Sequence, residues 1–577
     1  MKKLLILVAV CWVAHSNAQT TTQKSFDSFK EKFIDAYWKQ NTAGAISMGY
    51  GKYYEHLQIP DAAYFASTVS FSKQWLSSLH TIELKNLSQD DKISYNIIEN
   101  QLKKAIWEVE VFKIHHWDAS RYNIGGSAFN IISQTDLSLD ERLKMLSRRL
   151  QYAGKYYAAA LSTLSQPTKE HIELAIKQNE GSLSIFGNSL TDSINVSHLT
   201  TTDKNALQQH IGLTVGAINN YIAALKKILA QRSYSFRSFR IGEKLFNEKF
   251  QYDMVTDYTA KEIYRKAIAA KRTYHKEMYG IANKLWIKYC DGMLKPSDSL
   301  LLIKTVIDKI SLSHVPVAEI FNTINKQLSD LKQFIIKKEL FDFDTSAPVI
   351  VRLMPAFARG VAMASANFPL PYQKKSIAYY NVADLSAMPA EKAESQLREN
   401  NDYILQILTI HEAMPGHCMQ GVYNSKKSSD IVKAVFRNGA MSEGWAVYCE
   451  RMMLENGWGN DAPEMWLMFY KWSLRECCNV IIDYDIHCLN HSKMDVINLL
   501  KNEAFQEEAQ LEEKYHRATV SQVQLCSYFT GATEILALRA AYQKKMGSKY
   551  TLKGFHERFL GYGTAPVKFI RRAMLEK

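Results

Sequence analysis

Proline and glycine are both scarce in this chain. Its 577 residues include 12 prolines and 25 glycines, against usual shares of about 5% and 7%. Both residues interrupt helices, so their scarcity argues against a turn-rich β architecture and favours long helices. Hydrophobic residues make up 47% of the chain and charged residues 22%, a mixture that excludes a disordered or collagen-like protein.

Long apolar runs are also missing after the N-terminus, so we expect no membrane span. Residues 1–18 instead have the pattern of a secretory signal, with Lys2 and Lys3, a short apolar run and small residues ending at Ala18. We therefore expect an exported protein, periplasmic or extracellular. Cleavage before Cys11 would leave a signal of only ten residues, and Val10 suits that cleavage poorly, so the sequence argues against a lipoprotein.

Charge of one sign is nowhere concentrated, although the net charge is +13. The lysines occur as isolated pairs, for example Lys226-Lys227 and Lys544-Lys545, without a basic run or an aromatic RNA-binding signature. A solvated surface explains such pairs better than a nucleic-acid partner does.

Cysteines offer neither a complete disulfide set nor a metal cluster. Removal of Cys11 with the signal leaves an odd number, and most of the rest lie between 418 and 526 without CxxC spacing. We expect buried free thiols rather than a cysteine zinc site.

Helical periodicity dominates what is present. Apolar residues recur every three or four positions from Leu207 to Leu229, and similar patterns run through 81–108, 140–163, 259–288 and 315–337. Prolines cluster between 342 and 389, where 349–352 and 377–382 are typical of short strands. We expect a mainly α protein with a small β element, forming one large domain over 19–577 whose catalytic part covers about 340–577.

The richest chemistry lies in the sequence His411-Glu412-Ala-Met-Pro-Gly-His417, at the end of an apolar helical run. Zinc proteases use H-E-x-x-H, in which two histidines four apart share one helix face and the Glu acts on water. Six residues instead span about 600° and about 9 Å of a regular helix, so both imidazoles cannot reach one ion. Pro415 breaks the helix and Gly416 permits unusual dihedrals. We predict a two-residue bulge that restores the alignment of His417.

A third ligand is expected from the next helix, which begins near Ser442-Glu443-Gly444-Trp445 and ends near Asn456-Gly457. Glu443 would complete a set of two His and one carboxylate. Glu450 lies seven residues further on the same helix face, where it could orient a ligating His. For Trp445 and Tyr448 a place in the core is favoured over contact with substrate.

These motifs resemble the DUF885 family, exported bacterial proteins of uncharacterised function that are similar to zinc metallopeptidases. The likeness rests on H-E-A-x-P-G-H at 411–417, Gln420 and E-G-W-A-x-Y-x-E at 443–450, and extends over most of the mature chain. It implies a mainly α-helical, zincin-like peptidase with a deep cleft. Two departures matter: the family's second His is Cys418 here, and its P-G-Q is Gln522-Val523-Gln524.

The expected mechanism is metal-assisted hydrolysis. His411, His417 and Glu443 are predicted to hold Zn²⁺, and Glu412 to act as the general base. Tyr528, His487 and Arg517 are the candidate donors to the developing oxyanion, although a structural role fits each of them at least as well. The strand at 377–382 is a candidate edge for an extended peptide, or a plain hairpin arm.

Three functions remain open at this point. A secreted zinc peptidase acting on short peptides is favoured, beside a metal-dependent amidase on non-peptide amides and an inactive zincin-fold binding protein. Glu412 fits both enzymes, while Cys418 weakly favours the third. The sequence leaves open the choice of zinc over another divalent metal, the cleavage preference and the oligomeric state.

Overall fold

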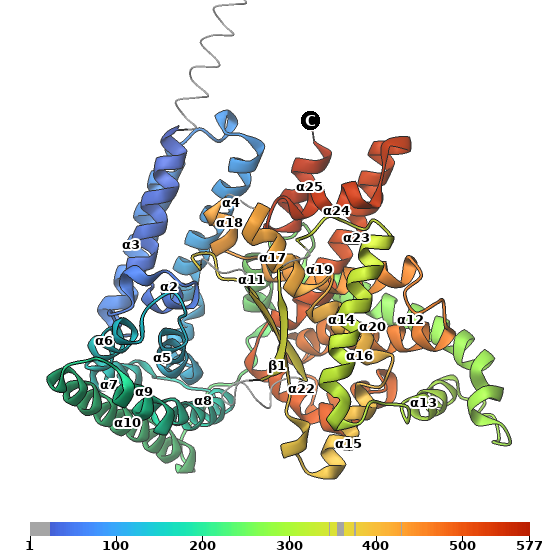
Figure 1. Ribbon diagram of the computed structural model, residues 1–577, viewed down its shortest axis with the longest axis horizontal. Coiled ribbons are helices and arrows are strands. Elements are labelled where there is room, and N and C mark those ends of the chain that lie inside the picture. The colour runs from blue at the N-terminus through green and yellow to red at the C-terminus, as the bar shows by residue number, and fades with distance from the viewer. Residues whose placement is uncertain (1–23, 345–346, 355–362, 374–376, 428–429, 577) are drawn as a thin grey trace, which may run out of the picture. The chain divides into compact units, whose positions relative to one another are not determined.

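The computed structural model describes residues 24–344, 347–354, 363–373, 377–427 and 430–576. The predicted signal segment and Cys11 lie outside this part of the chain. The described residues are mainly helical and include a small three-stranded sheet (Figure 1). The expected fold class is confirmed to this extent, whereas the zincin-like architecture and the deep cleft stay predictions.

Contacts within the chain divide it into two compact units. The first comprises Met1–Ser238, Leu370–Lys374 and Asp430–Phe436, and the second comprises Phe239–Pro369, Lys375–Ser429 and Arg437–Lys577. The sequence analysis did not foresee this division. Every residue that it proposed for the site belongs to the second unit.

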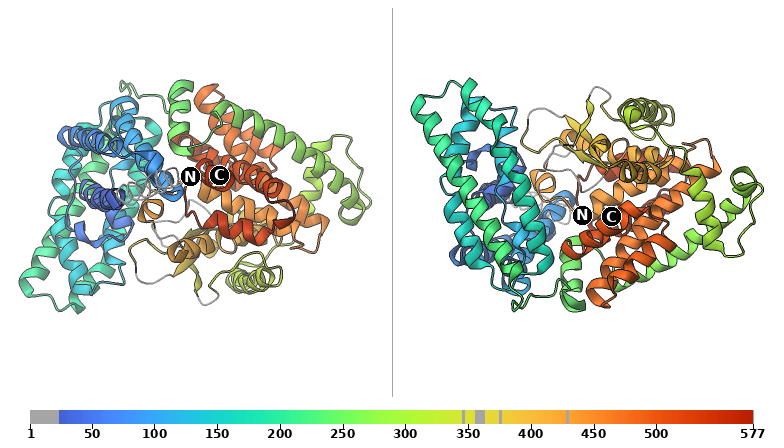
Figure 2. Two further views of the ribbon diagram at one scale, coloured as in Figure 1. Left: turned by 90° about the horizontal axis from the view of Figure 1, so that it is seen from above. Right: turned by 90° about the horizontal axis from the view of Figure 1, so that it is seen from below.

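The first unit is a helical bundle in which the long helix α10, Thr201–Ala230, packs against its neighbours (Figure 2). Leu207, Ile218, Ile222 and Leu225 are buried there, and their partly buried neighbours pack against the same core, as the periodicity predicts. The predicted helix at 140–163 is two helices, which meet near Gln151. Besides α10, the unit contains α2 (Thr42–Ser47), α3 (Ala62–His80), α4 (Gln89–Trp107), α5 (Gly125–Ile132), α6 (Leu139–Leu150), α7 (Ala153–Thr163), α8 (Lys169–Ser182), α9 (Asn188–Val196) and α18 (Ile431–Val435).

The second unit holds most of the remaining helices, with the HE motif near its centre. The long predicted helices at 259–288 and 315–337 correspond to α12 and α14. Its helices are α11 (Gly242–Met254), α12 (Ala260–Cys290), α13 (Ser299–Ile310), α14 (Ile320–Lys337), α15 (Ala390–Glu399), α16 (Ile404–Glu412), α17 (His417–Lys427), α19 (Gly439–Glu455), α20 (Pro463–Cys488), α21 (Lys493–Asn498), α22 (Glu508–Val520), α23 (Ser527–Met546), α24 (Leu552–Leu560) and α25 (Val567–Leu575).

The sheet has the strand order β1-β3-β2 and contacts both helices of the HE motif. β3 (Ala378–Val382) is the central strand, parallel to β1 (Val349–Leu353) and antiparallel to β2 (Ala364–Asn367). The prediction that 377–382 forms an edge is therefore wrong. An edge position belongs to β2, which sequence reasoning missed because Ala-Ser-Ala-Asn has little β propensity.

Two glycines let α19 and α23 approach at backbone distance. A Cβ on Gly444 would lie 2.3 Å from the carbonyl carbon of Gly531, and one on Gly531 would lie 1.7 Å from the carbonyl oxygen of Ala440. Only glycine fits at both positions. This contact brings Tyr528, one turn before Gly531, alongside Glu443, the residue before Gly444.

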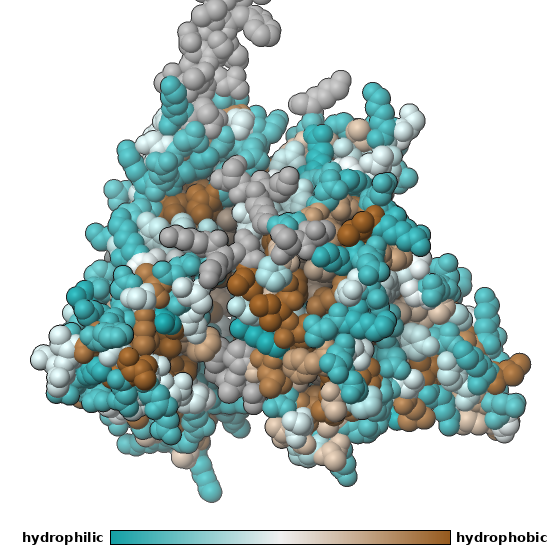
Figure 3. All heavy atoms as spheres, in the orientation of Figure 1, coloured by the Kyte–Doolittle hydropathy of each residue, from teal (hydrophilic) through white to brown (hydrophobic). Residues whose placement is uncertain are grey.

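The surface and the cysteines follow the sequence expectations. Hydrophilic residues cover most of the face in Figure 3, and the described lysine pairs 226–227 and 544–545 are exposed. None of the described helices is long and apolar enough to cross a membrane. The seven cysteines from Cys290 to Cys526 are free, and all except Cys488 are buried, which confirms the prediction for the described part of the chain.

Candidate metal centre

The helix break predicted between His411 and His417 is present. α16 ends at Glu412 and α17 begins at His417. Between them the Gly416 N–H donates to the carbonyl oxygen of Ile410 at 2.9 Å, and the Met419 N–H donates to that of Ala413 at 3.1 Å. Each of these bonds joins residues that are six apart, whereas an α-helix joins residues four apart. The turn therefore contains two residues more than a regular helix would, as predicted.

Gly416 and Trp445 hold this turn in place. A Cβ on Gly416 would lie 1.9 Å from the carbonyl oxygen of His411, so only glycine fits there. The Trp445 indole is fully buried, and its Nε1 donates to the carbonyl oxygen of Pro415 at 3.0 Å. Both Trp445 and Tyr448 belong to the core, as expected.

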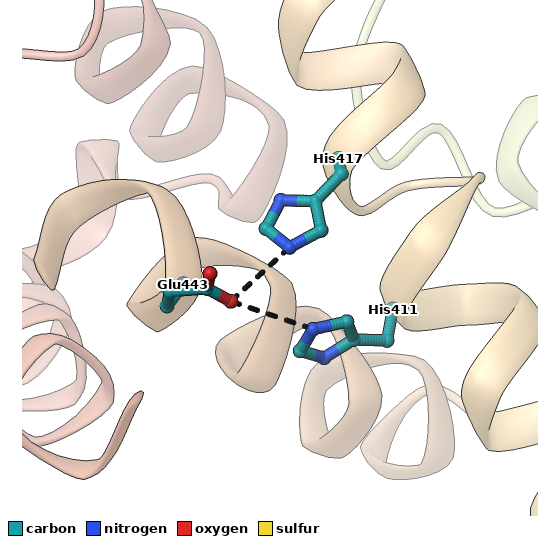
Figure 4. A group of neighbouring side chains, drawn as sticks. All are labelled: His411, His417 and Glu443. Carbon is teal, nitrogen blue, oxygen red and sulfur yellow. Dashed lines mark hydrogen bonds and ion pairs between the residues drawn. The ribbon is translucent and has the colours of Figure 1, made fainter. Parts of the chain in front are cut away.

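His411, His417 and Glu443 converge on one point (Figure 4). The Glu443 Oε2 atom lies 3.2 Å from His417 Nε2 and 3.7 Å from His411 Nε2. Candidate ligand atoms of the three residues all lie within 4.8 Å of one another. A tetrahedral zinc ion with bonds of about 2.1 Å separates its ligand atoms by about 3.4 Å. Both the kind of donor atom and their spacing fit such an ion.

Glu450 orients the first histidine. Its Oε1 lies 2.6 Å from His411 Nδ1 and also accepts a 3.0 Å hydrogen bond from Trp472 Nε1. This contact leaves His411 Nε2 to face Glu443 and His417. A carboxylate on the far nitrogen of a ligating His is the common way to fix its tautomer and orientation, so the role foreseen for Glu450 agrees with the geometry.

The charges around the three side chains favour an ionised carboxylate. Burial raises the pKa of Glu443, but His417 and His411 outweigh it and hold the pKa well below its usual range. Burial lowers the pKa of His411, yet Glu443 and Glu450 leave it raised well above its usual value. Burial, together with Glu450, raises the pKa of Glu476 well above its usual value, which disfavours the charged form of that carboxyl. The shifts therefore favour an ionised Glu443 carboxylate where the two imidazoles meet, and a metal cation that replaced the His411 proton would keep that carboxylate paired.

The three side chains line a cavity of about 400 Å³ together with Glu412 and Tyr528. The Tyr528 ring stacks at 6.4 Å on His411, and its hydroxyl accepts a 2.9 Å hydrogen bond from Arg517 Nη2. The same Arg517 nitrogen donates to Gln524 at 2.9 Å. Burial raises the pKa of Tyr528, and Glu443 adds to the rise, so its hydroxyl keeps its proton.

His487 and Cys418 lie away from this cavity. His487 is fully buried, and its Nε2 lies 3.0 Å from the carbonyl oxygen of Ala518 and 3.6 Å from Asp483. It is not among the lining residues, so the structure does not bring this candidate donor to the site. The Cys418 thiol faces the Tyr379 carbonyl oxygen at 3.8 Å and packs against the sheet. The replacement of the family's second His therefore leaves the three converging residues intact.

Sequence reasoning missed two parts of the cavity wall. β2 contributes Ala364, Ser365 and Ala366, and cationic side chains come from α20 and α22. Neither Arg475 nor Lys514 was among the predicted site residues. The available signal was the helical spacing of the polar residues Arg475, Glu476 and Asn479 within the largely apolar α20. α22 gave no such signal, because polar residues occur throughout it.

The family model of DUF885, described as a bacterial protein of unknown function, matches residues 43–574. The chain belongs to the DUF885 family. A search of curated proteins found no match. Among solved structures, a candidate lipoprotein of unknown function from Shewanella oneidensis is 43% identical, with a TM-score of 0.86 over 96% of this chain and 100% of its own.

A candidate lipoprotein from Colwellia psychrerythraea is 16% identical, with a TM-score of 0.77 over 96% of this chain and 98% of its own. At that identity the likeness concerns the fold alone. Both structures are of candidate lipoproteins, so the expectation that this DUF885 protein is not lipidated finds no support in them. Cys11 itself lies outside the described residues.

Proposed function

We propose that this protein is an exported zinc-dependent hydrolase, a metallopeptidase that cleaves short peptides. The observation that carries the proposal is the convergence of His411, His417 and Glu443 in a cavity that Glu412 also lines. Two histidines and one carboxylate with a fourth side open are the donor set of catalytic zinc. Zinc bound there would supply Lewis-acid chemistry for the hydrolysis of an amide.

Glu412 is the general base in this proposal. It follows His411 directly in α16 and lines the same cavity as the ligand set. Its carboxylate takes a proton from the water whose oxygen adds to the scissile carbonyl carbon. The same proton then passes to the leaving nitrogen, so that one water is added across the amide bond.

Tyr528 is the proposed donor to the oxyanion. Its hydroxyl accepts from Arg517, which orients the phenol and leaves its own proton to be donated into the cavity. Arg517 is therefore a positioning residue for Tyr528. A buried donor aimed at the developing charge is worth far more than one in water.

Short peptides fit the wall and the size of the cavity. The backbone at 364–366 belongs to a strand whose described pairing is with β3 alone, and it lines the cavity beside α16. An extended peptide can add to such a strand through main-chain hydrogen bonds. A volume of about 400 Å³ lies at the small end of the range for ligand pockets, which favours the end of a peptide over a folded protein.

The deciding experiment measures the metal content of the mature protein beside His417→Ala and Cys418→Ala. We expect about one zinc per chain in the wild type and in Cys418→Ala, and loss of it in His417→Ala. Glu412→Gln should keep the metal and lose peptide hydrolysis. Absence of bound zinc after zinc is supplied would contradict the proposal and favour the inactive binding protein instead.

A further inference from the structure

Two helices present a polar stripe to the same cavity. On α20 the lining residues are Trp472, Arg475, Glu476 and Asn479, and on α22 they are Gln510, Lys514 and Arg517. Both sets follow the three- and four-residue spacing of one helix face. The chain therefore places three basic side chains, Arg475, Lys514 and Arg517, on the wall of the cavity that holds the ligand set.

Lys514 is the most unusual of these cations. It is only 4% exposed, its Nζ donates a 2.8 Å hydrogen bond to Asn479 Oδ1, and it forms no ion pair with a described carboxylate. Burial lowers the pKa of Lys514 well below its usual value, and Arg475 and Arg517 add to the effect. The lowered pKa reflects the cost of holding an ammonium beside a neutral partner, and an anion in the cavity would favour the charged form of Lys514.

The carboxylates nearby do not neutralise the three cations. Glu399 lies 3.9 Å from Arg475, but its other oxygen already accepts from Lys471 at 2.8 Å. Burial raises the pKa of Glu476 well above its usual value, which disfavours its charged form. Glu513 precedes Lys514 in the chain and interacts electrostatically with it, yet it does not line the cavity. The α20–α22 side of the cavity thus has three basic side chains against one carboxyl group, that of Glu476.

We propose that Arg475, Lys514 and Arg517 bind the C-terminal carboxylate of a short peptide whose scissile bond lies at His411, His417 and Glu443. The proposal rests on the proposed hydrolase function and adds the substrate class to it. Guanidinium and ammonium groups match a carboxylate through charge-assisted hydrogen bonds. The enzyme is then an exopeptidase that acts near the carboxyl end.

Arg517 connects the carboxylate site to the proposed reaction site. Its Nη2 donates to Tyr528, whose ring stacks on His411. A carboxylate held by Arg475 and Lys514 therefore lies in the same cavity as the proposed base Glu412. A substrate that ends in this cavity has its last peptide bonds within it, since about 400 Å³ leaves little room for further chain.

The test compares N-acetylated short peptides as free acids and as C-terminal amides. Calorimetry on metal-free protein measures binding, and initial rates on zinc-loaded protein measure KM and kcat. We expect the amide to bind about 10- to 100-fold more weakly, with the change in KM rather than kcat, because one charge-assisted pair is lost. Equal binding of acid and amide by the wild type would overturn the proposal and needs no variant.

Lys514→Met tests the assigned residue, with Lys501→Met as the matched control. Lys501 is a half-exposed lysine that pairs with Glu508 outside the cavity. Lys514→Met should remove most of the preference for the acid, and Lys501→Met should keep it. Thermal unfolding shows whether each variant is folded, and an unchanged preference in folded Lys514→Met would contradict the assignment.

A third peptide distinguishes a carboxylate at the chain end from a carboxylate on a side chain. A C-terminal amide with an internal glutamate should bind as weakly as the plain amide. Binding equal to that of the free acid would overturn the assignment to the chain end. The calorimetric measurement needs no metal, so the two proposals can fail separately. A preference for the acid without hydrolysis would refute the hydrolase function alone. Hydrolysis without that preference would refute the carboxylate site alone.

Discussion

The indole nitrogen of Trp445 lies 3.0 Å from the carbonyl oxygen of Pro415, and this hydrogen bond joins the two halves of the candidate metal centre. Pro415 belongs to the turn that realigns His417, and Trp445 follows Glu443 by two residues on α19. One buried donor thus ties the helix that carries the third ligand to the turn that positions the second.

Trp445→Phe should destabilise the fold and weaken zinc binding. A smaller phenyl ring replaces the indole, and the buried Pro415 carbonyl also loses its donor, at a cost of about 1–3 kcal/mol for the lost hydrogen bond. Chemical unfolding and zinc titration measure the two effects. Trp458→Phe is the control, because Trp458 Nε1 is buried and has no hydrogen-bond partner among the described residues. Equal losses in the two variants would contradict a special role for the Trp445 bond.

Gly416→Ala should abolish the metal centre. The new methyl group would lie 1.9 Å from the His411 carbonyl oxygen, so the turn must open, at a cost of about 3 kcal/mol. Zinc content and thermal unfolding report the outcome. Gly439→Ala is the control, since a Cβ there meets nothing within 4 Å. Normal zinc content in Gly416→Ala would refute the geometry of the turn.

Glu450→Gln should lower zinc affinity about 10- to 100-fold, as removal of a carboxylate that orients a ligating His does elsewhere. The 2.6 Å contact with His411 Nδ1 is the one affected. Competition with a chelator measures the affinity. Glu455→Gln on the same helix is the control, because Glu455 pairs with Arg451 and Arg539 instead. Unaltered affinity in Glu450→Gln would show that His411 needs no such partner.

Part of this centre was predictable from sequence because its chemistry is local. His411, Glu412 and His417 lie within seven residues, and the proline and glycine between them imply the break. Glu443 and Glu450 lie seven residues apart in the E-G-W-A-x-Y-x-E motif, so helix spacing places both on one face. The wall contributed by Arg475 and Lys514 depends on how α20 and α22 pack, which one sequence does not fix. His487 was misplaced for the same reason, because a buried structural His and a catalytic one look alike in sequence.

The contact of Gly444 with Gly531 could not be predicted from the sequence either. Neither glycine stands out in its own helical segment. Only the crossing of α19 and α23 shows that both positions require glycine. β2 was missed because its pairing with β3, not its composition, makes it a strand.

Glu534 should make stability fall as pH rises. Burial raises its pKa from 4.5 to about 7, partly offset by the hydrogen bond from Thr256. The folded state then holds a proton that the unfolded state releases above about pH 4.5, so this contribution favours folding at low pH and is lost between about pH 4.5 and 7. Unfolding of Glu534→Gln across that range should show a weaker pH dependence than the wild type, by up to about 3 kcal/mol. Glu512→Gln, at an exposed position, should behave as the wild type does.

Tyr528→Phe separates catalysis from structure at the proposed site. The ring that stacks on His411 stays, and only the hydroxyl that accepts from Arg517 is removed. Loss of one oxyanion donor should lower kcat about 100- to 1,000-fold, with KM and zinc content nearly unchanged. Tyr542→Phe, on the same helix but outside the cavity, should keep full activity. A rise in KM with normal kcat would instead place the hydroxyl in substrate binding, because only interactions gained in the transition state alter kcat alone.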